Sequence, residues 1–493
     1  MSCAGLNPAI KELSTMSAPM LSFVSVPQAQ PDKRTADARL KDFDEIYVDF
    51  ARSEAERQAS RCSQCGVPFC SVHCPLGNNI PDWLMLTAEG RLEEAYAVSS
   101  ATNTFPEICG RICPQDRLCE GNCVIEKGFE SVTIGAVERF VTDTAFEQGW
   151  VKPALPVREL GTSVGVVGAG PAGLAAAERL RAAGHTVHVY DRHDRVGGLL
   201  IYGIPGFKLE KHIVARRQKL LEEQGVVFHL NQAIGAGSGE VSLGQLRERH
   251  DAVLIATGVY KSRDIGGPGS GLAGIVPALD YLTASNRRSL GDALPEGELD
   301  AADKDVVVIG GGDTAMDCVR TAVRQGARSV KCLYRRDRAN MPGSVREVKN
   351  AEEEGVEFVW LAAPEAFLGD DTVTGVRAQR MRLGLPDGTG RQSIEPEPDG
   401  LFTVKADMVI KALGFDPEPL PEQWDAEDLE VSRWGTLKVD RERFETSLPG
   451  VFAAGDIVRG ASLVVWAIRD GRDAATQIHK WIKERALAPL AAE

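Results

Sequence analysis

The sequence of 493 residues contains no apolar run near the roughly 20 residues that a membrane-spanning helix requires. Cations are outnumbered, with 56 lysines and arginines against 70 aspartates and glutamates, which gives a net charge of −14. Because a nucleic-acid surface needs clustered lysine and arginine, and no such stripe is present, the sequence argues against a nucleic-acid partner. Residues 1–30 also lack the basic segment and apolar core of a secretory signal. These absences predict a cytoplasmic protein without membrane or nucleic-acid partners.

Length and periodicity predict several domains, about two to four for a chain of this size. Residues 1–30 show little periodicity and are predicted to be a mobile arm or leader, whereas residues 31–155 have helical periodicity and hold most of the cysteines. Ser53 and Glu56 have the spacing of a capping box, which predicts a helix N-terminus at Ser53. The proline-containing link 152–156 marks the predicted boundary to the next domain.

A glycine-rich turn after the apolar run 164–167 is typical of a dinucleotide-binding unit of strand, helix and strand. Gly168 suits the tight turn, Gly170 allows the backbone to approach a pyrophosphate closely, and Gly173 allows the following helix to pack closely on the strand. The helix N-terminus would then direct its unpaired N–H groups at the phosphates. Asp191 follows the second strand, where a carboxylate can accept a hydrogen bond from a ribose hydroxyl. The agreement of these parts favours a nucleotide site over an ordinary strand-to-helix loop.

The same unit begins a second time at residue 305. Gly310 and Gly312 follow an apolar strand, alanine replaces the third glycine, and Arg335 and Arg336 stand where the first unit has Asp191. An arginine there can pair with a 2′-phosphate, whereas an acidic residue repels it. The first unit is therefore assigned to FAD and the second to NADPH. A solvated basic turn is the alternative interpretation of the two arginines.

Segments on both sides of the second unit are predicted to complete the flavin site. They are the glycine-rich segment 197–203, a buried strand over 251–258, and a strand before Asp456, whose carboxylate would accept a hydrogen bond from the ribityl chain unless it is a plain turn residue. A helix over 462–477 would direct its N-terminal dipole at the reduced ring. The predicted cofactor-binding residues are Gly168, Gly170, Pro171, Ala172, Gly173, Asp191, Gly198, Leu199, Thr257, Gly258, Gly455 and Asp456 for FAD, and Gly310, Gly312, Asp313, Thr314, Arg335 and Arg336 for NADPH.

Eight cysteines between residues 62 and 123 form two quartets. In a reducing compartment such spacing indicates metal ligands rather than disulfides. Two quartets ahead of flavin-binding segments favour two [4Fe–4S] clusters, because each cluster takes four thiolates and a Cys-Pro pair can end such a run. Four-cysteine zinc is the competing interpretation, although zinc offers no redox chemistry to a flavoprotein. Cys318 and Cys332 are predicted to be core residues of the second nucleotide unit.

The sequence as a whole predicts an α/β protein, in which an N-terminal helical iron–sulfur domain precedes two Rossmann-like domains, the second inserted in the first. The expected ranges are 31–155 for the helical domain, 156–290 and 416–493 for the FAD domain, and 300–415 for the NADPH domain. Since cofactors carry the chemistry in such a protein, no catalytic acid–base pair is expected.

Several motifs together resemble those of the small (β) subunits of NADPH-dependent glutamate synthase. They are Cys62-Ser-Gln-Cys65-Gly-Val-Pro-Phe-Cys70, Cys74-Pro-Leu-Gly-Asn, Cys109-Gly-Arg-Ile-Cys113-Pro-Gln, Gly168-Ala-Gly-Pro-Ala-Gly173 and Tyr334-Arg-Arg-Asp. The resemblance extends from about Phe23 to the end of the chain. The same module is similar to the N-terminal part of dihydropyrimidine dehydrogenase and to the larger subunit of an NADPH–ferredoxin transhydrogenase.

The resemblance implies a set of cluster ligands. The related pyrimidine enzyme fills its eighth ligand position with a glutamine that matches Glu138, whereas a count of thiols alone would choose Cys109. The resemblance favours Glu138. Because this chain has glutamate where the pyrimidine enzyme has glutamine, the reduction potential of that cluster does not carry over from the resemblance. The implied ligands are Cys62, Cys65, Cys70 and Cys123 for one [4Fe–4S] cluster, and Cys74, Cys113, Cys119 and Glu138 for the other.

The resemblance also implies a function in ammonia assimilation. Hydride would pass from NADPH to FAD, and electrons would pass through the clusters to a large (α) subunit. That subunit holds the glutaminase and FMN and forms glutamate from 2-oxoglutarate and glutamine. The present chain is expected to contain neither, since no glutaminase nucleophile stands near its N-terminus. A stand-alone NADPH:ferredoxin-type reductase and a non-catalytic structural partner are the alternatives.

Overall fold

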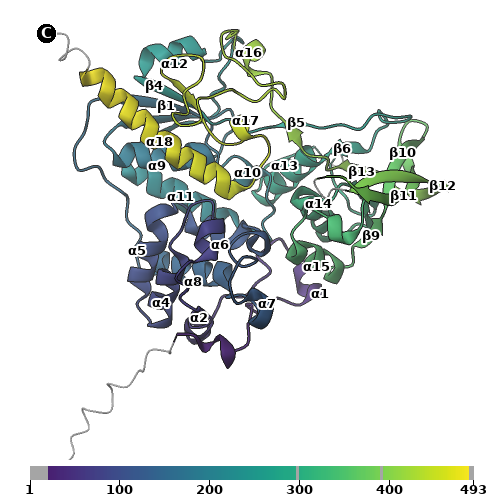
Figure 1. Ribbon diagram of the computed structural model, residues 1–493. Helices are drawn as coiled ribbons and strands as arrows, with labels where there is room; N and C mark the ends of the chain where they lie inside the picture. The colour runs from purple at the N-terminus through teal and green to yellow at the C-terminus, as the bar shows by residue number, and fades with distance from the viewer. Residues whose placement is uncertain (1–19, 296–298, 389–391, 488–493) are drawn as a thin grey trace, which may run out of the picture. The chain divides into compact units, whose positions relative to one another are not determined.

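The computed structural model describes residues 20–295, 299–388 and 392–487, and the first part of the predicted arm, residues 1–19, lies outside the described residues. Figure 1 shows the chain coloured from the N-terminus in purple to the C-terminus in yellow. Within the described ranges, no helix has both the length and the apolar character to cross a membrane.

The chain divides into two compact units. Unit 1, made of residues up to 32 and of 49–151, is helical, and unit 2, made of 33–48 and 152–493, contains the sheets. Trp83 is buried in the core of unit 1 among apolar residues of the surrounding helices. The helices of unit 1 are α2 (Arg52–Ala59), α3 (Phe69–His73), α4 (Ile80–Ala88), α5 (Leu92–Thr102), α6 (Pro106–Ile112), α7 (Glu126–Phe129) and α8 (Ile134–Glu147).

The N-terminus of α2 corrects one expectation. The helix begins at Arg52, and Ala51 occupies the N-cap position without a side-chain hydrogen bond. The carbonyl of Ala51 already accepts a hydrogen bond from the amide of Glu54, so Ser53 lies inside the first turn. Glu56 instead pairs with Arg52 at 2.8 Å. The predicted capping box at Ser53 is therefore wrong.

Unit 2 contains two parallel five-stranded sheets, which confirms the two Rossmann-like domains. The first sheet has the order β15-β4-β1-β2-β3, and β15 joins it from near the end of the chain. The second sheet, β6-β13-β7-β8-β9, is formed by residues between β4 and β15, so the second domain is inserted in the first, as predicted. The strands are β1 (Ser163–Val167), β2 (Thr186–Tyr190), β3 (Val226–His229), β4 (Ala252–Ile255) and β15 (Val451–Ala453) in the first sheet, and β6 (Ile275–Pro277), β7 (Asp305–Ile309), β8 (Ser329–Tyr334), β9 (Glu357–Trp360) and β13 (Met408–Lys411) in the second.

Each glycine turn opens a helix, α9 (Pro171–Ala182) after β1 and α14 (Asp313–Arg324) after β7. The last helix, α18 (Val464–Leu487), is longer than the predicted 462–477 and lies along α9, as the yellow helix in Figure 1 shows. Close packing requires a glycine there, because a Cβ at Gly471 would lie 2.0 Å from the carbonyl oxygen of Ala172. The other helices of unit 2 are α1 (Ala36–Arg39), α10 (Leu199–Tyr202), α11 (Lys211–Gln224), α12 (Leu243–Arg249), α13 (Ala278–Ser289), α15 (Val345–Glu353), α16 (Leu420–Gln423) and α17 (Asp456–Arg459).

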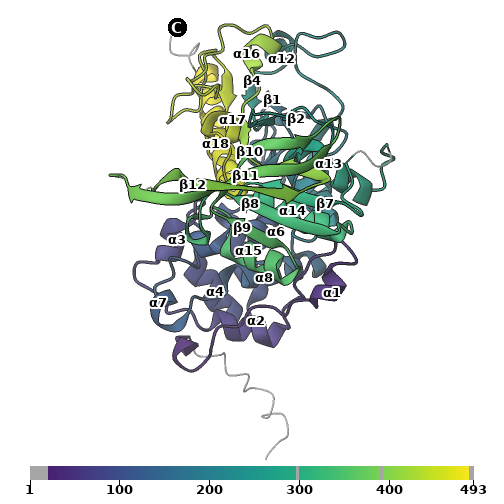
Figure 2. The ribbon, with the colours of Figure 1, turned by 90° about the vertical axis from the view of Figure 1, so that its right-hand side faces the viewer.

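A three-stranded antiparallel sheet is present that was not predicted from the sequence. It has the order β10 (Ala362–Gly369), β11 (Val373–Pro386) and β12 (Gln392–Lys405) and stands at the front of Figure 2. The pairing of β11 with β12 shifts register between Gln379 and Met381, and the apolar positions of β11 change phase there, from Val376 and Ala378 to Met381 and Leu383. No single two-residue alternation, by which a half-buried strand is recognised, therefore runs the length of β11.

A buried network of charges joins three parts of unit 2. Glu354, whose side chain is fully buried after α15, accepts hydrogen bonds from Arg39 at 3.2 Å, Arg320 at 2.9 Å and Arg324 at 2.6 Å. The guanidinium groups of Arg320 and Arg324, both on α14, lie 4.4 and 4.1 Å from the ring centre of Phe207. Phe207 belongs to the first Rossmann domain and Arg39 to the N-terminal segment of unit 2. The network thus fixes both Rossmann domains and this segment against one another.

Histidines gather on β2 of the first sheet and on the elements packed against it. His250 hydrogen-bonds Ser163 at 2.7 Å and Tyr190 at 3.0 Å, and His185 lies 2.9 Å from His479. Burial lowers the pKa of both His185 and His250 to about 4. These rings are therefore neutral in the folded protein at neutral pH.

We expect this arrangement to make the first Rossmann domain sensitive to acid. The pKa of a histidine in the unfolded chain is about 6.5, so between pH 6.5 and 4 the unfolded chain binds protons that the folded chain does not. Stability is accordingly complete above pH 6.5 and falls as the pH drops towards 4. His250→Gln should reduce the slope of unfolding free energy against pH near pH 5 by up to about 1.4 kcal/mol per pH unit. Thermal unfolding of both proteins from pH 7.5 to 5 measures this, and parallel pH profiles would contradict it.

Candidate cofactor sites

The glycine turn of the first sheet has the geometry that a dinucleotide needs. Gly168 has a φ of 108°, and a Cβ there would lie 2.4 Å from the carbonyl oxygen of Ala256. A Cβ on Gly173 would lie 1.9 Å from the carbonyl oxygen of Gly168, so α9 packs against the turn only with glycine. Nothing lies within 4 Å of a Cβ on Gly170. That open space, at the N-terminus of α9, can admit a pyrophosphate.

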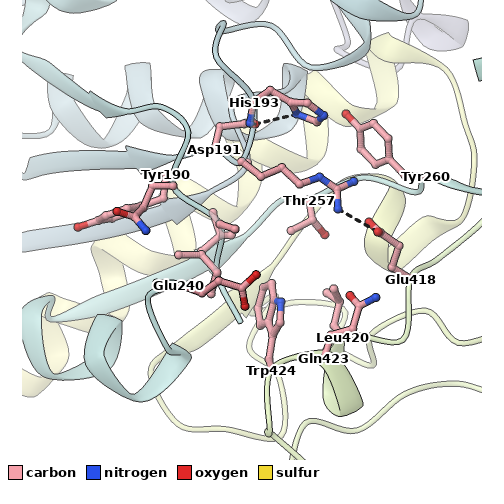
Figure 3. Close-up of a pocket in the computed structure, with 16 residues that line it drawn as sticks. Tyr190, Asp191, His193, Glu240, Thr257, Tyr260, Glu418, Leu420, Gln423 and Trp424 are labelled. Carbon is pink, nitrogen blue, oxygen red and sulfur yellow. Dashed lines mark hydrogen bonds and ion pairs between the residues drawn. The ribbon is translucent and has the colours of Figure 1, made fainter. Parts of the chain in front are cut away.

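Two adjoining cavities extend from this turn. One, of about 370 Å³, is drawn in Figure 3 and is lined by residues that include Tyr190, Glu240 and Trp424. The other, of about 110 Å³, continues towards the N-terminal end of α18. Both cavities share Gly168, Asp191, Thr257 and Tyr260. The second is also lined by Gly170, Pro171, Ala172, Leu199, Gly258 and Asp456, whereas Gly173, Gly198 and Gly455 line neither and serve close packing.

Asp191 already holds the glycine turn. Its carboxylate accepts hydrogen bonds from the backbone amides of Ala169 at 2.7 Å and His193 at 2.8 Å, and His193 Nδ1 lies 3.0 Å away. The contact with His193 is dashed in Figure 3. Asp191 therefore fixes the floor of the cavity and can still present a carboxylate oxygen to a ribose.

Three residues of the same cavity were not predicted from the sequence. Arg192 lies over the ring of Tyr260, 4.8 Å from its centre, and donates a hydrogen bond to Glu418 at 2.9 Å. Burial raises the pKa of Tyr260. Glu418 comes from the return segment of the domain, 226 residues later in the chain, so no local pattern could have found this contact.

Two polar side chains of the second cavity fit a bound flavin nucleotide. The hydroxyl oxygen of Thr257 is buried and has no hydrogen-bond partner among the described residues. Asp456 accepts a hydrogen bond from Ser462 at 2.6 Å, and burial raises the pKa of its carboxyl group. Burying a hydroxyl group without a hydrogen-bond partner costs free energy. A flavin nucleotide in the cavity would supply the missing partner. The residues present therefore fit FAD.

The second sheet repeats the turn with different surroundings. Gly310 has a φ of 149°, and a Cβ there would lie 2.3 Å from the carbonyl oxygen of Ala412, whereas the space beside Gly312 is open. Asp313 accepts a hydrogen bond from the amide of Ser344 at 2.9 Å, and Thr314 follows it in the first turn of α14. This turn also has room for a pyrophosphate at a helix N-terminus.

The strand register refines the position of the two arginines. The amide of Gly168 donates to the carbonyl of Tyr190, and that of Gly310 donates to the carbonyl of Leu333, so the position of Asp191 is taken by Tyr334. The prediction that the arginines begin at the position of Asp191 is therefore wrong by one residue. Arg335 and Arg336 follow directly. Arg335 is exposed with no ion pair to the described residues, and Arg336 donates to the carbonyl of Gln392 at 3.1 Å.

The thiols of unit 1 form two groups by the charges that act on each of them, and the two groups meet where Cys70 acts on Cys119. Cys62, Cys65, Cys70 and Cys123 form the first thiol group. The second thiol group consists of Cys74, Cys109, Cys113 and Cys119, with Glu138 among them. These are the two sets that the resemblance implied, except that Cys109 accompanies the second. Burial raises the pKa of Cys62 to about 11 and that of Cys70 to about 12.

Each thiol group has the ligand types that a [4Fe–4S] cluster requires. Such a cluster takes four ligands, and the first group offers four thiols while the second offers four thiols and the carboxyl group of Glu138. The residues present therefore fit [4Fe–4S] clusters. Among the described residues, no three His, Cys, Asp or Glu side chains are grouped closely enough to hold a single metal ion.

One residue contacts both candidates for the eighth ligand. Asn103 donates a hydrogen bond to Glu138 at 3.1 Å, and the thiol of Cys109 lies 3.7 Å from its amide oxygen. Burial raises the pKa of Glu138 to about 8. Asn103, which was not predicted from the sequence, therefore holds both Glu138 and Cys109 within the second thiol group.

Family comparisons agree with this division. A family model described as dihydropyrimidine dehydrogenase domain II, 4Fe-4S cluster, matches residues 39–150, and one described as pyridine nucleotide-disulphide oxidoreductase matches residues 162–471. FprA from Mycobacterium tuberculosis, solved in complex with NADPH, has a TM-score of 0.57 at 20% identity, over 66% of this chain and 86% of that one. At that identity the likeness shows the fold alone.

Curated relatives match over nearly the whole chain. The glutamate synthase [NADPH] small chain of Azospirillum brasilense is 67% identical over 96% of this chain and 98% of its own length. That of Escherichia coli K12 is 44% identical over 95% of this chain and 100% of its own. The putative oxidoreductase AegA of Escherichia coli K12 is 45% identical over 97% of this chain but over only 73% of its own length. The chain belongs to the family of NADPH-dependent glutamate synthase small chains, which are FAD- and iron–sulfur-containing oxidoreductases.

Proposed function

We propose that the chain is the electron-input subunit of a cytoplasmic glutamate synthase. It would accept hydride from NADPH onto FAD in unit 2 and pass electrons through two [4Fe–4S] clusters in unit 1 to a large (α) subunit. One observation carries the proposal: two nucleotide turns and two thiol groups occur together in this chain. The chain also matches a glutamate synthase small chain over 96% of its length.

When bound, NADPH, FAD and the clusters supply the hydride and one-electron chemistry. The residues of the first Rossmann domain bind and orient FAD. The amides at the start of α9 would hold the pyrophosphate beside Gly170, Asp191 would accept a hydrogen bond from the ribose, and Thr257 and Asp456 would contact the flavin half. Val464, at the start of α18, lines the same cavity, so the N-terminal dipole of α18 would stabilise negative charge there.

The residues of the second Rossmann domain bind and select NADPH. The amides at the start of α14 would hold its pyrophosphate beside Gly312, and Asp313 would keep the turn in place through Ser344. Arg335 and Arg336 would pair with the 2′-phosphate.

The direct test is anaerobic. The purified chain is mixed with NADPH, or with NADH in a parallel cuvette, and the absorption of its flavin is followed. The chain is then mixed with the large subunit, and glutamate formation is measured. We expect flavin bleaching that prefers NADPH, over a broad iron–sulfur background, and glutamate formation only with both subunits. Unbleached flavin would refute the reductase, and bleaching without glutamate formation at equal amounts of the two subunits would refute the partner.

A stand-alone reductase that supplies ferredoxin is the second candidate. It is favoured by AegA, an oxidoreductase longer than this chain that carries the same module without the synthase name. Rapid NADPH-dependent reduction of an added ferredoxin, combined with no glutamate formation, would identify it.

We further propose Glu138 as the eighth cluster ligand, and two variants test the assignment. Glu138→Ala should lose about half of the bound iron, because one cluster needs four ligands. Cys109→Ser should keep iron near the wild-type level. Iron content and the electron paramagnetic resonance spectrum of the reduced chain measure this, and iron loss in Cys109→Ser alone would assign Cys109 instead.

A further inference from the structure

Exposed apolar side chains in unit 1 are concentrated around one of the two thiol groups. Val67, Phe69 and Val72 flank Cys70, and Val124 follows Cys123, with Phe129 at the end of α7. Their exposed fractions lie between 47 and 66%. These five side chains are called the apolar rim below.

The rest of unit 1 presents no such surface. In the parts of unit 1 that the structure describes, α4, α5, α6 and α8 carry no large apolar side chain that is exposed. The two others in this unit belong to the segment 21–24, which also contacts the first thiol group, since the amide of Leu21 donates to the carbonyl of Cys62 at 3.3 Å. The apolar surface of unit 1 is thus confined to one redox site.

The same thiol group is the more exposed of the two. Three of its four thiols, Cys65, Cys70 and Cys123, are partly exposed, whereas in the second group Cys74 and Cys119 are partly exposed and Cys109 and Cys113 are buried. Figure 2 shows α3 and α7, which carry most of the rim, on the same side of unit 1. Phe129 packs edge-on against Phe23 at 4.9 Å, so the rim is a fixed surface rather than a mobile loop.

Apolar surface of this kind is costly unless it is covered. Contiguous exposed apolar patches on soluble proteins mark interaction sites, and the centre of a protein interface is depleted of charge. An electron can leave the chain only where a redox site reaches the surface. Because the apolar rim surrounds the partly exposed thiols, the point at which electrons leave the chain and the surface that binds a partner would coincide.

We propose that the apolar rim is the docking surface for the large subunit, and that electrons leave the chain from the first thiol group, Cys62, Cys65, Cys70 and Cys123. This inference rests on the proposed function. Each transfer moves one electron to a flavin or iron–sulfur centre of the partner, which is reduced, while the cluster is oxidised and no bond forms or breaks.

The test compares charged substitutions in the rim with a matched one elsewhere. Val72→Glu and Val124→Glu place a carboxylate in the rim from two separate segments, and Val157→Glu places one on an exposed valine of unit 2. The full chain with its cofactors is titrated with the large subunit under anaerobic conditions, and Kd is measured by sedimentation. Iron content and flavin bleaching by NADPH report the integrity of each variant.

We expect Val72→Glu and Val124→Glu each to raise Kd at least about tenfold, which corresponds to about 1.4 kcal/mol. Val157→Glu should stay near the wild-type Kd, and all three should keep their iron and bleach with NADPH. Wild-type Kd in both rim variants would overturn the docking surface while leaving the proposed function intact. Failure of the wild-type chain to bind the large subunit would overturn both. If the wild-type chain self-associates and only that association is lost in the rim variants, the rim binds a second copy and the proposal is wrong.

Discussion

Replacing Glu354 by alanine is expected to lower the free energy of unfolding of unit 2 by about 3–5 kcal/mol. Glu354 is fully buried and is shared by Arg39, Arg320 and Arg324. Its removal leaves three guanidinium groups in a region from which water is excluded, with Glu347 as the nearest remaining buried carboxylate, 2.5 Å from Arg320. Removing one partner from such a network costs far more than the net value of the pairs, because Arg324 stays buried without a carboxylate partner among the described residues, while Arg320 keeps only Glu347 and Arg39 only Glu353.

Glu353→Ala is the matched control, because it removes a carboxylate one residue away. Glu353 pairs with Lys33 and Arg39, but its side chain is 32% exposed, so water can replace it and the expected loss is below about 1 kcal/mol. Glu354→Gln keeps the shape and should lose most of the stability, which would assign the effect to charge. Thermal unfolding of the full chain, followed by release of FAD fluorescence, compares the three variants. Equal effects of the changes at 353 and 354 would contradict the assigned role of Glu354.

The same network has a consequence for the reaction. α14 carries at its N-terminus the glycine turn proposed for NADPH, and Phe207 lies between α10 and α11, close in sequence to Leu199 of the cavity proposed for FAD. The contact between Phe207 and the two arginines of α14 therefore fixes the two nucleotide sites relative to each other. A variant that loosens it should slow flavin reduction by NADPH even where both nucleotides still bind.

Local patterns were enough to predict the two nucleotide units. A short apolar strand, three glycines and a helix lie within a few residues of one another, so the spacing alone specifies the turn at Gly168 and again at Gly310. The return of β15 to the first sheet was also predictable, because Gly455 and Asp456 mark the end of a buried strand. The grouping of the cysteines followed from the resemblance rather than from their spacing.

Contacts between distant segments were not predictable in this way. The pairing of Arg192 with Glu418 joins residues 226 positions apart, and the hydrogen bond from Arg39 to Glu354 joins residues 315 positions apart. No local periodicity records such pairs. β11 was missed because its apolar alternation changes phase at the register shift between Gln379 and Met381. The arginines after β8 were assigned to the position of Asp191, which Tyr334 occupies, because only the hydrogen bonds of the sheet define that position.

The preference for NADPH over NADH is expected to depend on Arg335 and Arg336. Arg335 is exposed and unpaired among the described residues. The position that Asp191 occupies after the first sheet's β2 is taken in the second sheet by Tyr334, which does not repel a phosphate. Hydrogen bonds to a charged group contribute about 1.5–3 kcal/mol, so Arg335→Ala combined with Arg336→Ala should raise KM for NADPH by about 10- to 100-fold and leave KM for NADH nearly unchanged. Anaerobic flavin reduction at varied NADPH and NADH gives both constants.

Arg338→Ala is the control for this result, because Arg338 lies in the same basic segment but is already paired with Glu352 at 2.6 Å. It should not change the ratio of the two KM values. The hydrogen bond from Arg336 to the carbonyl of Gln392 ties this arginine to β12 and orients its remaining N–H groups. A guanidinium held in this way loses less freedom on binding a phosphate. Arg336→Ala alone should then cost more affinity for NADPH than Arg335→Ala alone, and an equal fall for both nucleotides would show that the arginines stabilise the fold instead of reading the 2′-phosphate.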